Sequence, residues 1–315
     1  MENFFDYYEL NKSSDDFKSV FRKEQTGKIC RFCNHSFPTV SFKNTPHIMP
    51  ELFGRNNMTS NFECDDCNKK FQKFETDTST MIQHYVSLLN IKTKKGVPTF
   101  QSIKKEEHYS TTLKSINSQP NFNFRTNLSD FEYNEKEKTL TVSFRTKKFS
   151  PFSVYKTFLK IGISLLSDKE LQENNHYIDF LNLNEPLING MQVWNSFRYM
   201  LKTKYYTTPK ADLYKAKQTL IDNEVFPEYV LLICFSNIIF QFFLPISNKN
   251  IQEYNKQDKL RIEMFPSFLY DDVSKLKAVE MYNLDLAEEK KVSITDKVVL
   301  HYDKIDRNIT KNISS

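Results

Sequence analysis

Glycine is scarce in this chain, with 5 glycines among 315 residues. Proteins that hold a phosphate group with their backbone need glycine-rich loops, and the sequence contains neither a G-x-G-x-x-G run nor a P-loop pattern. Any chemistry on phosphate groups must therefore come from side chains and metal ions. The N-terminal residues, M-E-N-F-F-D-Y-Y-E, are acidic and polar, and they lack the basic start and apolar run of a secretion signal.

Long apolar runs are also few, and the longest covers residues 229–246. It is rich in β-branched and aromatic residues, and Ser236, Asn237 and Gln241 interrupt it. These features argue against a membrane-spanning helix and predict two buried strands that turn near Ser236 and Asn237. We therefore expect no membrane partner.

The formal net charge of +5 is small for a chain of this length. Nucleic-acid binding depends on local basic patches more than on the total charge. Such clusters usually form only a solvated surface, but the first two follow the cysteine-containing region described next and are candidates for phosphate contacts. The four clusters lie at residues 92–95, 104–105, 145–148 and 202–204.

The five cysteines are distributed unevenly. Four form two C-x-x-C pairs, Cys30 with Cys33 and Cys64 with Cys67. Two pairs at this separation are typical of a zinc site, because four thiolates complete a tetrahedral coordination sphere and each pair reaches the metal from one turn. Two disulfides, or cysteines kept for packing, are the alternative. Cys234 lies in the apolar run, where we expect a small core residue. Free thiolates suit a reducing compartment and predict a cytoplasmic protein.

Two further residues stand in a fixed order with these cysteines. His47 lies between the pairs in the run P-H-I-M-P, and Asn68 directly follows the fourth cysteine. This order resembles that of the HNH, or ββα-metal, endonucleases, and it is similar to that of phage endonuclease VII. The runs H-x-x-P-E-L-x-G at residues 47–54 and K-K-G-V-P at residues 94–98 resemble a bacterial HNH group.

The resemblance implies a zinc cluster that pins two strands and a helix. It implies that His47 is the general base on the first strand, and that Asn68, near the helix start, binds a catalytic Mg²⁺ or Mn²⁺. These residue types suit the task, because neutral imidazole accepts a proton from water near pH 7 and an amide oxygen is a hard ligand for Mg²⁺. The implied products of DNA hydrolysis are a 5′-phosphate and a 3′-hydroxyl. A packed or zinc-proximal histidine is the alternative for His47.

One position departs from the family pattern. Many members carry an aspartate before the histidine as a second metal ligand, and here Pro46 cannot bind a metal. If a helix begins near Asp65, Glu75 lies two turns after Asn68 on the same face and could replace the missing ligand. The other carboxylates that could do so are Glu51 and Asp77. Each of the three could instead be a solvated side chain.

The family also has an asparagine that braces the loop between its two strands. The segment 55–61 contains three candidates and gives no reason to choose among them, since loop asparagines often serve only as turn residues. They are Asn56, Asn57 and Asn61.

Length and periodicity predict an α+β protein with two domains. Residues 1–105 are expected to form the HNH domain, and residues 106–315 a second α+β domain with an antiparallel sheet that senses a ligand, binds a partner or forms a homodimer. Predicted helices cover residues 3–23, 65–78, 81–89, 150–165 and 168–181, with Asp65 or Asp66 as cap of the second. Predicted strands cover residues 39–42, 46–49, 130–133, 139–144, 213–220, 262–269 and 298–302, and residues 104–118 are expected to form a linker or loop.

The function that the sequence favours is a divalent-metal-dependent endonuclease acting on DNA, with structural zinc and, by family resemblance, a role in bacterial defence. Two alternatives stay open. In the first, Pro46 marks a degenerate active site and the protein is a non-catalytic zinc module that binds nucleic acid or protein. In the second, the enzyme cleaves RNA.

Overall fold

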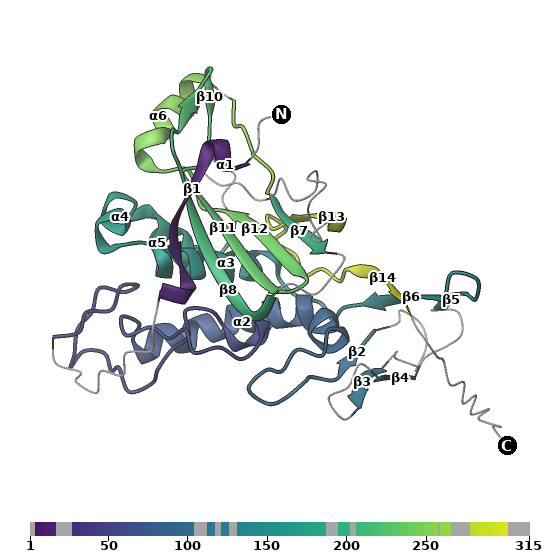
Figure 1. Ribbon diagram of the computed structural model, residues 1–315. Helices are drawn as coiled ribbons and strands as arrows, with labels where there is room; N and C mark the ends of the chain where they lie inside the picture. Colours follow the sequence, from purple (N-terminus) through teal and green to yellow (C-terminus); the bar gives the residue numbers. More distant parts are fainter. Residues whose placement is uncertain are drawn as a thin grey trace.

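A six-stranded antiparallel sheet forms the centre of the protein (Figure 1). The computed structural model describes residues 4–16, 27–103, 112–116, 121–125, 131–186, 195–201, 206–257, 259–265 and 278–301. In spatial order the strands of the sheet are β1 (Tyr8–Ser13), β8 (Tyr206–Ala216), β11 (Tyr229–Ser236), β12 (Ile238–Phe243), β7 (Asn195–Leu201) and β13 (Ala278–Asp285). The α+β class predicted from the sequence is confirmed.

The two middle strands are the predicted apolar hairpin. β11 and β12 pair antiparallel and turn at Ser236 and Asn237, where Ser236 has a positive φ of 52°. Every residue of both strands is buried. Side chains of β11 alternate between the two cores on either side of the sheet, as Leu231 and Leu232 do. The run is predominantly apolar because both faces of the sheet are covered.

Helix α3 (Pro151–Leu165) covers one face of the sheet. Ser150 caps it by accepting a hydrogen bond from the Ser153 amide, and Pro151 occupies the first helical position, as the sequence predicts. The Phe158 ring packs against the rings of Phe240 and Phe242 at centroid distances of 5.4 and 5.7 Å. The predicted helix at 168–181 is wrong as a single unit, because it divides into α4 (Asp168–Glu173) and α5 (His176–Asn182).

Helix α2 (Asp65–Leu88) packs on the side of α3 that faces away from the sheet. Two helices were expected here, but α2 is one continuous helix of 24 residues. The predicted caps are also wrong. Cys64 is the N-cap, and its sulfur accepts from the Cys67 amide, while Asp65 instead accepts hydrogen bonds from the 41–44 loop. A buried hydrogen bond of 2.9 Å joins Thr78 to Thr157 of α3.

The N-terminal segment does not form the expected helix against the cysteine region. Helix α1 (Phe4–Tyr7) has only four residues, and the chain continues as β1 at the edge of the six-stranded sheet. Phe4 and Tyr8 pack in the core on the face opposite α3, which explains why this segment is aromatic without a helical period. Residues 17–23 of the prediction lie outside the described residues.

Two three-stranded sheets and several short elements complete the fold. The predicted hairpin at 130–144 is confirmed for residues 131–144, and the predicted strand at 298–302 is confirmed up to His301. A linker was expected at residues 104–118, but residues 112–116 form a strand. A strand was expected at residues 262–269, but residues 262–265 form no strand. The predicted strand at 213–220 is confirmed for residues 213–216, the end of β8, whereas residues 217–219 form no strand and Leu220 begins β9. The remaining elements are η1 (Ser14–Asp16), η2 (Glu51–Phe53), α6 (Asn248–Gln257), β2 (Phe100–Gln101), β3 (Thr112–Ile116), β4 (Asn121–Arg125), β5 (Phe131–Asn134), β6 (Thr139–Arg145), β9 (Leu220–Ile221), β10 (Glu224–Val225) and β14 (Thr295–His301).

One hydrophobic core runs across the predicted domain boundary at residue 105. It contains Cys30 and Phe71 from the cysteine region, Phe158 from α3, and Phe240 from the sheet. The cysteine region therefore packs against α3. The domain boundary at residue 105 stays a prediction. None of the helices described here is long and apolar enough to cross a membrane.

Candidate active site and metal cluster

The four paired cysteines come together in one cluster. Their sulfur atoms all lie within 4.8 Å of one another, and those of Cys33 and Cys64 are 3.8 Å apart. Sulfur atoms bound at about 2.3 Å to a tetrahedral zinc ion are about 3.8 Å apart. A disulfide would require about 2.05 Å, and all four thiols are free. The spacing therefore fits a metal site and rules out the disulfide reading.

The backbone around these thiols also fits a bound cation. The Cys64 amide donates to the Cys30 sulfur at 3.4 Å and the Cys67 amide to the Cys64 sulfur at 3.5 Å, which are the outer contacts that orient metal-bound thiolates. A hydrogen bond from Cys67 lowers the pKa of Cys30 to about 4, whereas burial raises the pKa of Cys64 to about 12. Four thiolates at this distance repel one another, so a divalent cation is needed to hold them all in that form.

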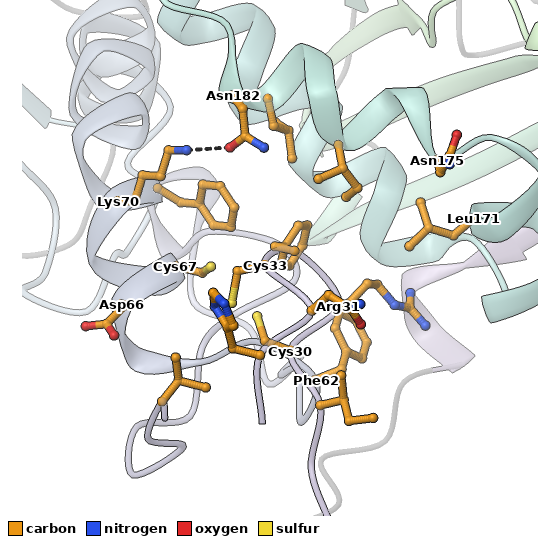
Figure 2. Close-up of a pocket in the computed structure, with 18 of the residues that line it drawn as sticks. Cys30, Arg31, Cys33, Phe62, Asp66, Cys67, Lys70, Leu171, Asn175 and Asn182 are labelled. Atoms are coloured by element: carbon orange, nitrogen blue, oxygen red, sulfur yellow. Dashed lines mark hydrogen bonds between the residues drawn. The ribbon is translucent and has the colours of Figure 1, made fainter. Parts of the chain in front are cut away.

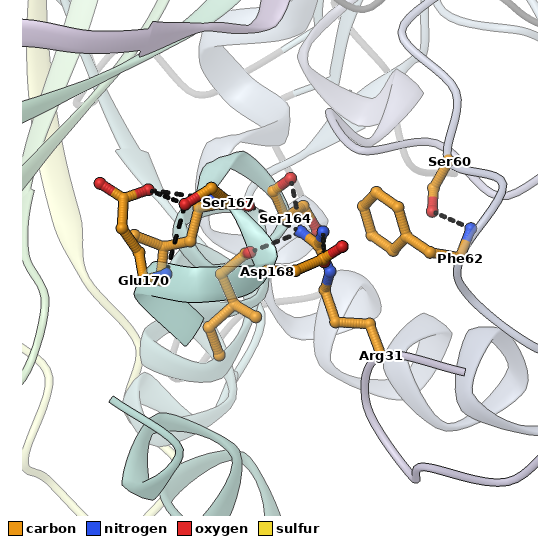
Figure 3. A network of polar contacts seen from close by, with 9 residues as sticks. Arg31, Ser60, Phe62, Ser164, Ser167, Asp168 and Glu170 are labelled. Carbon is orange, nitrogen blue, oxygen red and sulfur yellow. Dashed lines mark hydrogen bonds and ion pairs between the residues drawn. The ribbon is translucent and has the colours of Figure 1, made fainter. Parts of the chain in front are cut away.

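Arg31, inside the first cysteine pair, ties the cluster to α3 (Figure 3). Its guanidinium donates to the carbonyl oxygens of Ile163, Ser164 and Leu166, at 3.3, 3.3 and 2.9 Å, and pairs with Asp168 at 2.6 Å. The last carbonyl groups of a helix have no partner within the helix, and a cation there is favourable. The Arg31 guanidinium also lies over the Phe62 ring, 3.9 Å from its centroid.

The extended segment 46–49, here named the His47 strand, pairs antiparallel with residues 58–60 through one isolated bridge. His47 forms a bridge with Thr59, the Ile48 amide donates to the Met58 carbonyl at 2.8 Å, and the Ser60 amide donates to the Pro46 carbonyl at 2.7 Å. The predicted extended piece at 46–49 is thus present as a single bridge. The other, at 39–42, forms no strand.

Asn56 orients the His47 ring. Its amide nitrogen donates to the carbonyl oxygens of Met49 and Gly54, at 3.0 and 3.1 Å, so its oxygen must face the other way. That oxygen accepts from the Met58 amide at 3.1 Å and lies 3.2 Å from Nδ1 of His47. Nδ1 therefore carries the proton and donates it to Asn56, which leaves the lone pair of Nε2 free to accept a proton.

The structure distinguishes the three loop asparagines that the sequence left open. Of these three asparagines, Asn56 alone forms a hydrogen bond with His47 in the described part of the chain, and its four hydrogen bonds hold the turn that follows the histidine strand. Asn57 and Asn61 are exposed. Gly54 permits this turn because its φ is 131°, and a side chain there would come within 3.1 Å of Ile91.

Helix α2 presents Asn68 and Glu75 on one face, as the helical spacing predicts. Both side chains are half-buried, and no described residue forms a hydrogen bond with the Asn68 amide group. Burial raises the pKa of Glu75, and the nearby charge of Lys160, followed by a charge on His47, counteracts this shift, so both groups lie within electrostatic reach of Glu75. Asn68 and Glu75 are thus two oxygen donors on one face of α2.

The other two carboxylate candidates differ in position. Asp77 follows Asn68 by nine residues, which at about 100° per residue places it on the opposite face of α2. It lies 3.8 Å from Lys291, away from the histidine. The Glu51 carboxylate lies 3.7 Å from Nε2 of His47. Glu51 and Glu75 are therefore the acidic groups near the imidazole, and Asp77 is not.

A basic turn lies beside this loop. The Arg55 amide donates to the Lys92 carbonyl at 2.9 Å, and the Arg55 guanidinium donates to the carbonyl oxygens of Thr93 and Lys94 at 3.0 and 3.4 Å. These bonds hold the turn 92–95 against the loop that contains Asn56. The lysines of the turn are exposed, and they are Lys92, Lys94 and Lys95. The first basic cluster of the sequence thus borders the histidine loop.

An open pocket of about 1260 Å³ borders the cluster of four cysteines (Figure 2). The first cysteine pair and the start of α2 form one wall, and α4 and α5 form the other. Lys70 of α2 crosses it to donate to Asn182 of α5 at 2.6 Å. Asp66 and Lys70 lie on the face of α2 opposite Asn68, so the pocket and the histidine do not share one site.

Two charged residues near His47 were missed in the sequence. Lys160 of α3 is 1 % exposed and donates to the His47 carbonyl oxygen at 2.6 Å, and its ammonium group lies 3.2 Å from the carboxylate of Glu63. Burial raises the pKa of Glu63 to about 7, while the charge of Lys160 opposes this shift. The sequence did contain a signal, because Lys156 and Lys160 interrupt a helix that is otherwise largely apolar. The structure shows that both lysines are buried.

Comparison with known proteins identifies the cysteine region. Residues 30–82 match the family model of the HNH endonucleases. No curated protein and no solved structure shows a significant match to the chain. The resemblance inferred from the cysteines, His47 and Asn68 is therefore confirmed, and it covers the metal cluster, the histidine strand and most of α2. The rest of the chain, including α3 and the six-stranded sheet, lies outside the match.

Proposed function

We propose that the protein is an endonuclease that hydrolyses DNA phosphodiester bonds with the help of a divalent metal ion. The observation that carries this proposal is the His47 imidazole, whose Nδ1 donates to Asn56 while Nε2, 3.7 Å from the Glu51 carboxylate, accepts no hydrogen bond from a described residue. A fixed neutral imidazole is the arrangement that a general base requires near pH 7.

His47 takes a proton at Nε2 from the water that attacks phosphorus, and the bond to Asn56 holds the ring in the tautomer that can accept it. Asn68, with Glu75 or Glu51 in place of the aspartate that Pro46 replaces, supplies hard oxygen ligands for Mg²⁺ or Mn²⁺. When bound, such an ion neutralises charge that develops on the phosphate and on the leaving oxygen. The four-cysteine cluster holds a structural zinc ion and fixes the start of α2 through the Cys64 cap.

The basic turn at residues 92–95 supports nucleic acid as the substrate. Its lysines are exposed, and Arg55 fixes the turn beside the histidine loop, where a phosphate backbone entering the site would pass. The turn offers charge and no element that reads base edges, so we propose that it contacts the backbone and that cleavage depends little on sequence.

The test is cleavage of supercoiled plasmid DNA by the zinc-loaded protein with added Mg²⁺, with an RNA substrate assayed in parallel. We expect His47→Ala to lower the cleavage rate by about 10²- to 10⁴-fold, the usual cost of losing a general base. Asn68→Ala should also lose activity but regain part of it at raised Mn²⁺, which tolerates less demanding coordination. His301→Ala, at an exposed histidine of β14, is the matched control and should cleave normally.

One observation favours a second function. Pro46 occupies the position of a family metal ligand, which would fit a zinc module that binds nucleic acid or protein without cleaving it. Normal zinc content, DNA binding and no nicking at any Mg²⁺ or Mn²⁺ concentration would establish that function. Unchanged cleavage by His47→Ala would also reject the proposed mechanism.

The wider role is proposed from the family resemblance alone. A cytoplasmic enzyme that cuts foreign DNA would serve bacterial defence, and the region after residue 105 would sense a ligand, bind a partner or join two copies of the chain. Plaque counts with wild type and His47→Ala, together with the mass of the protein in solution, test these points.

A further inference from the structure

Lys160 is a buried lysine on a helix that lies outside the segment matching the HNH family. Its side chain is 2 % exposed, and that of its ion-pair partner Glu63 is 0 % exposed. Burying a charged pair costs free energy unless further bonds compensate for the lost water. The ammonium group of Lys160 has such a bond, because it donates to the backbone carbonyl of His47 at 2.6 Å.

We propose that Lys160 is a positioning residue for the general base, held in place by Glu63. The proposal rests on the proposed function, since it assigns Lys160 to the same reaction. Lys160 forms a hydrogen bond with the backbone carbonyl of His47, and Asn56 forms one with the ring. The backbone and the imidazole of His47 are therefore both held in position. The HNH segment then depends on α3, an element that its own sequence does not provide.

The charges around Lys160 agree with a role in holding the His47 strand. Glu63 precedes the metal cluster, Glu75 lies on α2, and both carboxylates are within electrostatic reach of the Lys160 ammonium group. The Phe71 ring covers it, with the nitrogen 5.9 Å from the ring centroid. A neutral residue at 160 would leave Glu63 as an unpaired buried charge and the His47 carbonyl without this donor.

The effect on catalysis follows from geometry. A general base must lie within about 2.6–3.2 Å of the proton that it takes. A displacement of about 1 Å can lower a rate by about 10²-fold. Lys160 touches neither substrate nor metal ligand, so its loss should reduce kcat and leave KM nearly unchanged.

The test uses the full chain with zinc bound. Lys160→Met alone can fail to fold, so the main variant is the double change Lys160→Met with Glu63→Gln, which removes both charges together. The matched control is Lys156→Met. Lys156 is one turn earlier on α3 and is also buried, but it donates to the Leu183 carbonyl of the loop after α5 and not to the histidine strand.

Two measurements separate positioning from general stability. The first is kcat and KM for plasmid cleavage, where we expect the double variant to lose about 10²-fold in kcat and Lys156→Met to keep the wild-type value even if it melts earlier. The second is amide hydrogen exchange at Ile48 and Ser60, whose bonds join the His47 strand to residues 58–60. Their exchange should accelerate about 10- to 100-fold in the double variant, the factor expected for losing one bond from a charged donor.

Wild-type kcat in a folded, zinc-containing double variant would overturn the proposal while leaving the proposed nuclease intact. Equal losses of kcat in the double variant and in Lys156→Met would also overturn it, because the effect would then be one of stability. If the wild type cleaves neither DNA nor RNA, the proposed function fails. The exchange measurement then decides whether Lys160 holds the His47 strand, and unchanged exchange at Ile48 and Ser60 rejects that as well.

Discussion

Arg31 offers a direct measure of how firmly the metal cluster is joined to the rest of the protein. The change is Arg31→Met, which keeps the apolar stem and removes the guanidinium group. In the wild type this group caps the carboxyl end of α3 and lies over the Phe62 ring. It is 12 % exposed, whereas its ion-pair partner Asp168 is 83 % exposed.

The magnitude can be built from these contacts. The three carbonyl contacts come from one nitrogen, and only that to Leu166, at 2.9 Å, is short, so we count one bond from a charged donor at about 1.5–3 kcal/mol. The cation–π contact with Phe62 adds about 0.5–1 kcal/mol. The pair with Asp168 adds less than about 1 kcal/mol because that carboxylate is exposed. Arg31→Met should therefore lower the free energy of unfolding by about 2–5 kcal/mol.

The assay is urea unfolding at pH 7 with excess zinc, in which the free energy in water and the slope are compared with the wild type. Asp168→Asn is the control and should cost less than about 1 kcal/mol. Zinc content should stay at the wild-type level in both variants, since neither removes a cysteine. A loss below about 0.5 kcal/mol in Arg31→Met, or an equal loss in Asp168→Asn, would contradict the assignment of the buried carbonyl contacts as the main contribution.

Three other predictions follow from the same structure. One tightly bound zinc ion per chain is expected, and Cys64→Ser should unfold the cysteine region because zinc binding contributes folding free energy directly; folded protein without zinc would contradict this. DNA affinity should fall steeply with salt and weaken when Lys94 and Lys95 are changed to Glu, whereas tight binding at high salt would count against backbone contacts. Burial lowers the pKa of Lys156 from 10.5 to about 8. Between pH 8 and pH 10.5 the unfolded chain therefore binds more protons than the folded chain. The free energy of unfolding should rise with pH across this range, by at most about 3 kcal/mol. Lys156→Met should remove that rise, and an unchanged rise in the variant would assign it to other groups.

The metal cluster and the central hairpin could be predicted because their signals are local. Cysteine spacing within each pair fixes a turn, and an apolar run interrupted at Ser236 and Asn237 fixes a hairpin, whatever the rest of the chain does. The helix start at Ser150 and Pro151 is equally local. The cap of α2 was misassigned because the prediction used only local residue type, and by residue type Asp65 is a better cap than Cys64. The structure instead uses Asp65 to bind the 41–44 loop.

The contacts that complete the site could not be predicted because they join distant segments. Lys160 lies 113 residues after His47 in the sequence, and Arg31 lies 135 residues before Leu166. No spacing rule relates such pairs. Among the three loop asparagines, only the turn geometry selects Asn56. The N-terminal strand was missed because β8, the strand with which it pairs among the described residues, begins about 200 residues later.

The two lysines of α3 show what the sequence pattern means in physical terms. A lysine within an apolar helix is stable only where its ammonium group finds an acceptor, because an unpaired buried charge costs several kcal/mol. Lys156 finds the end of α5, and Lys160 finds the histidine strand and Glu63. Arg31 reaches the end of the same helix from the metal cluster. With the Thr78–Thr157 bond, these contacts join helix α3 to the cysteine region at three separate points, so a displacement of α3 would move the metal cluster and the His47 strand together.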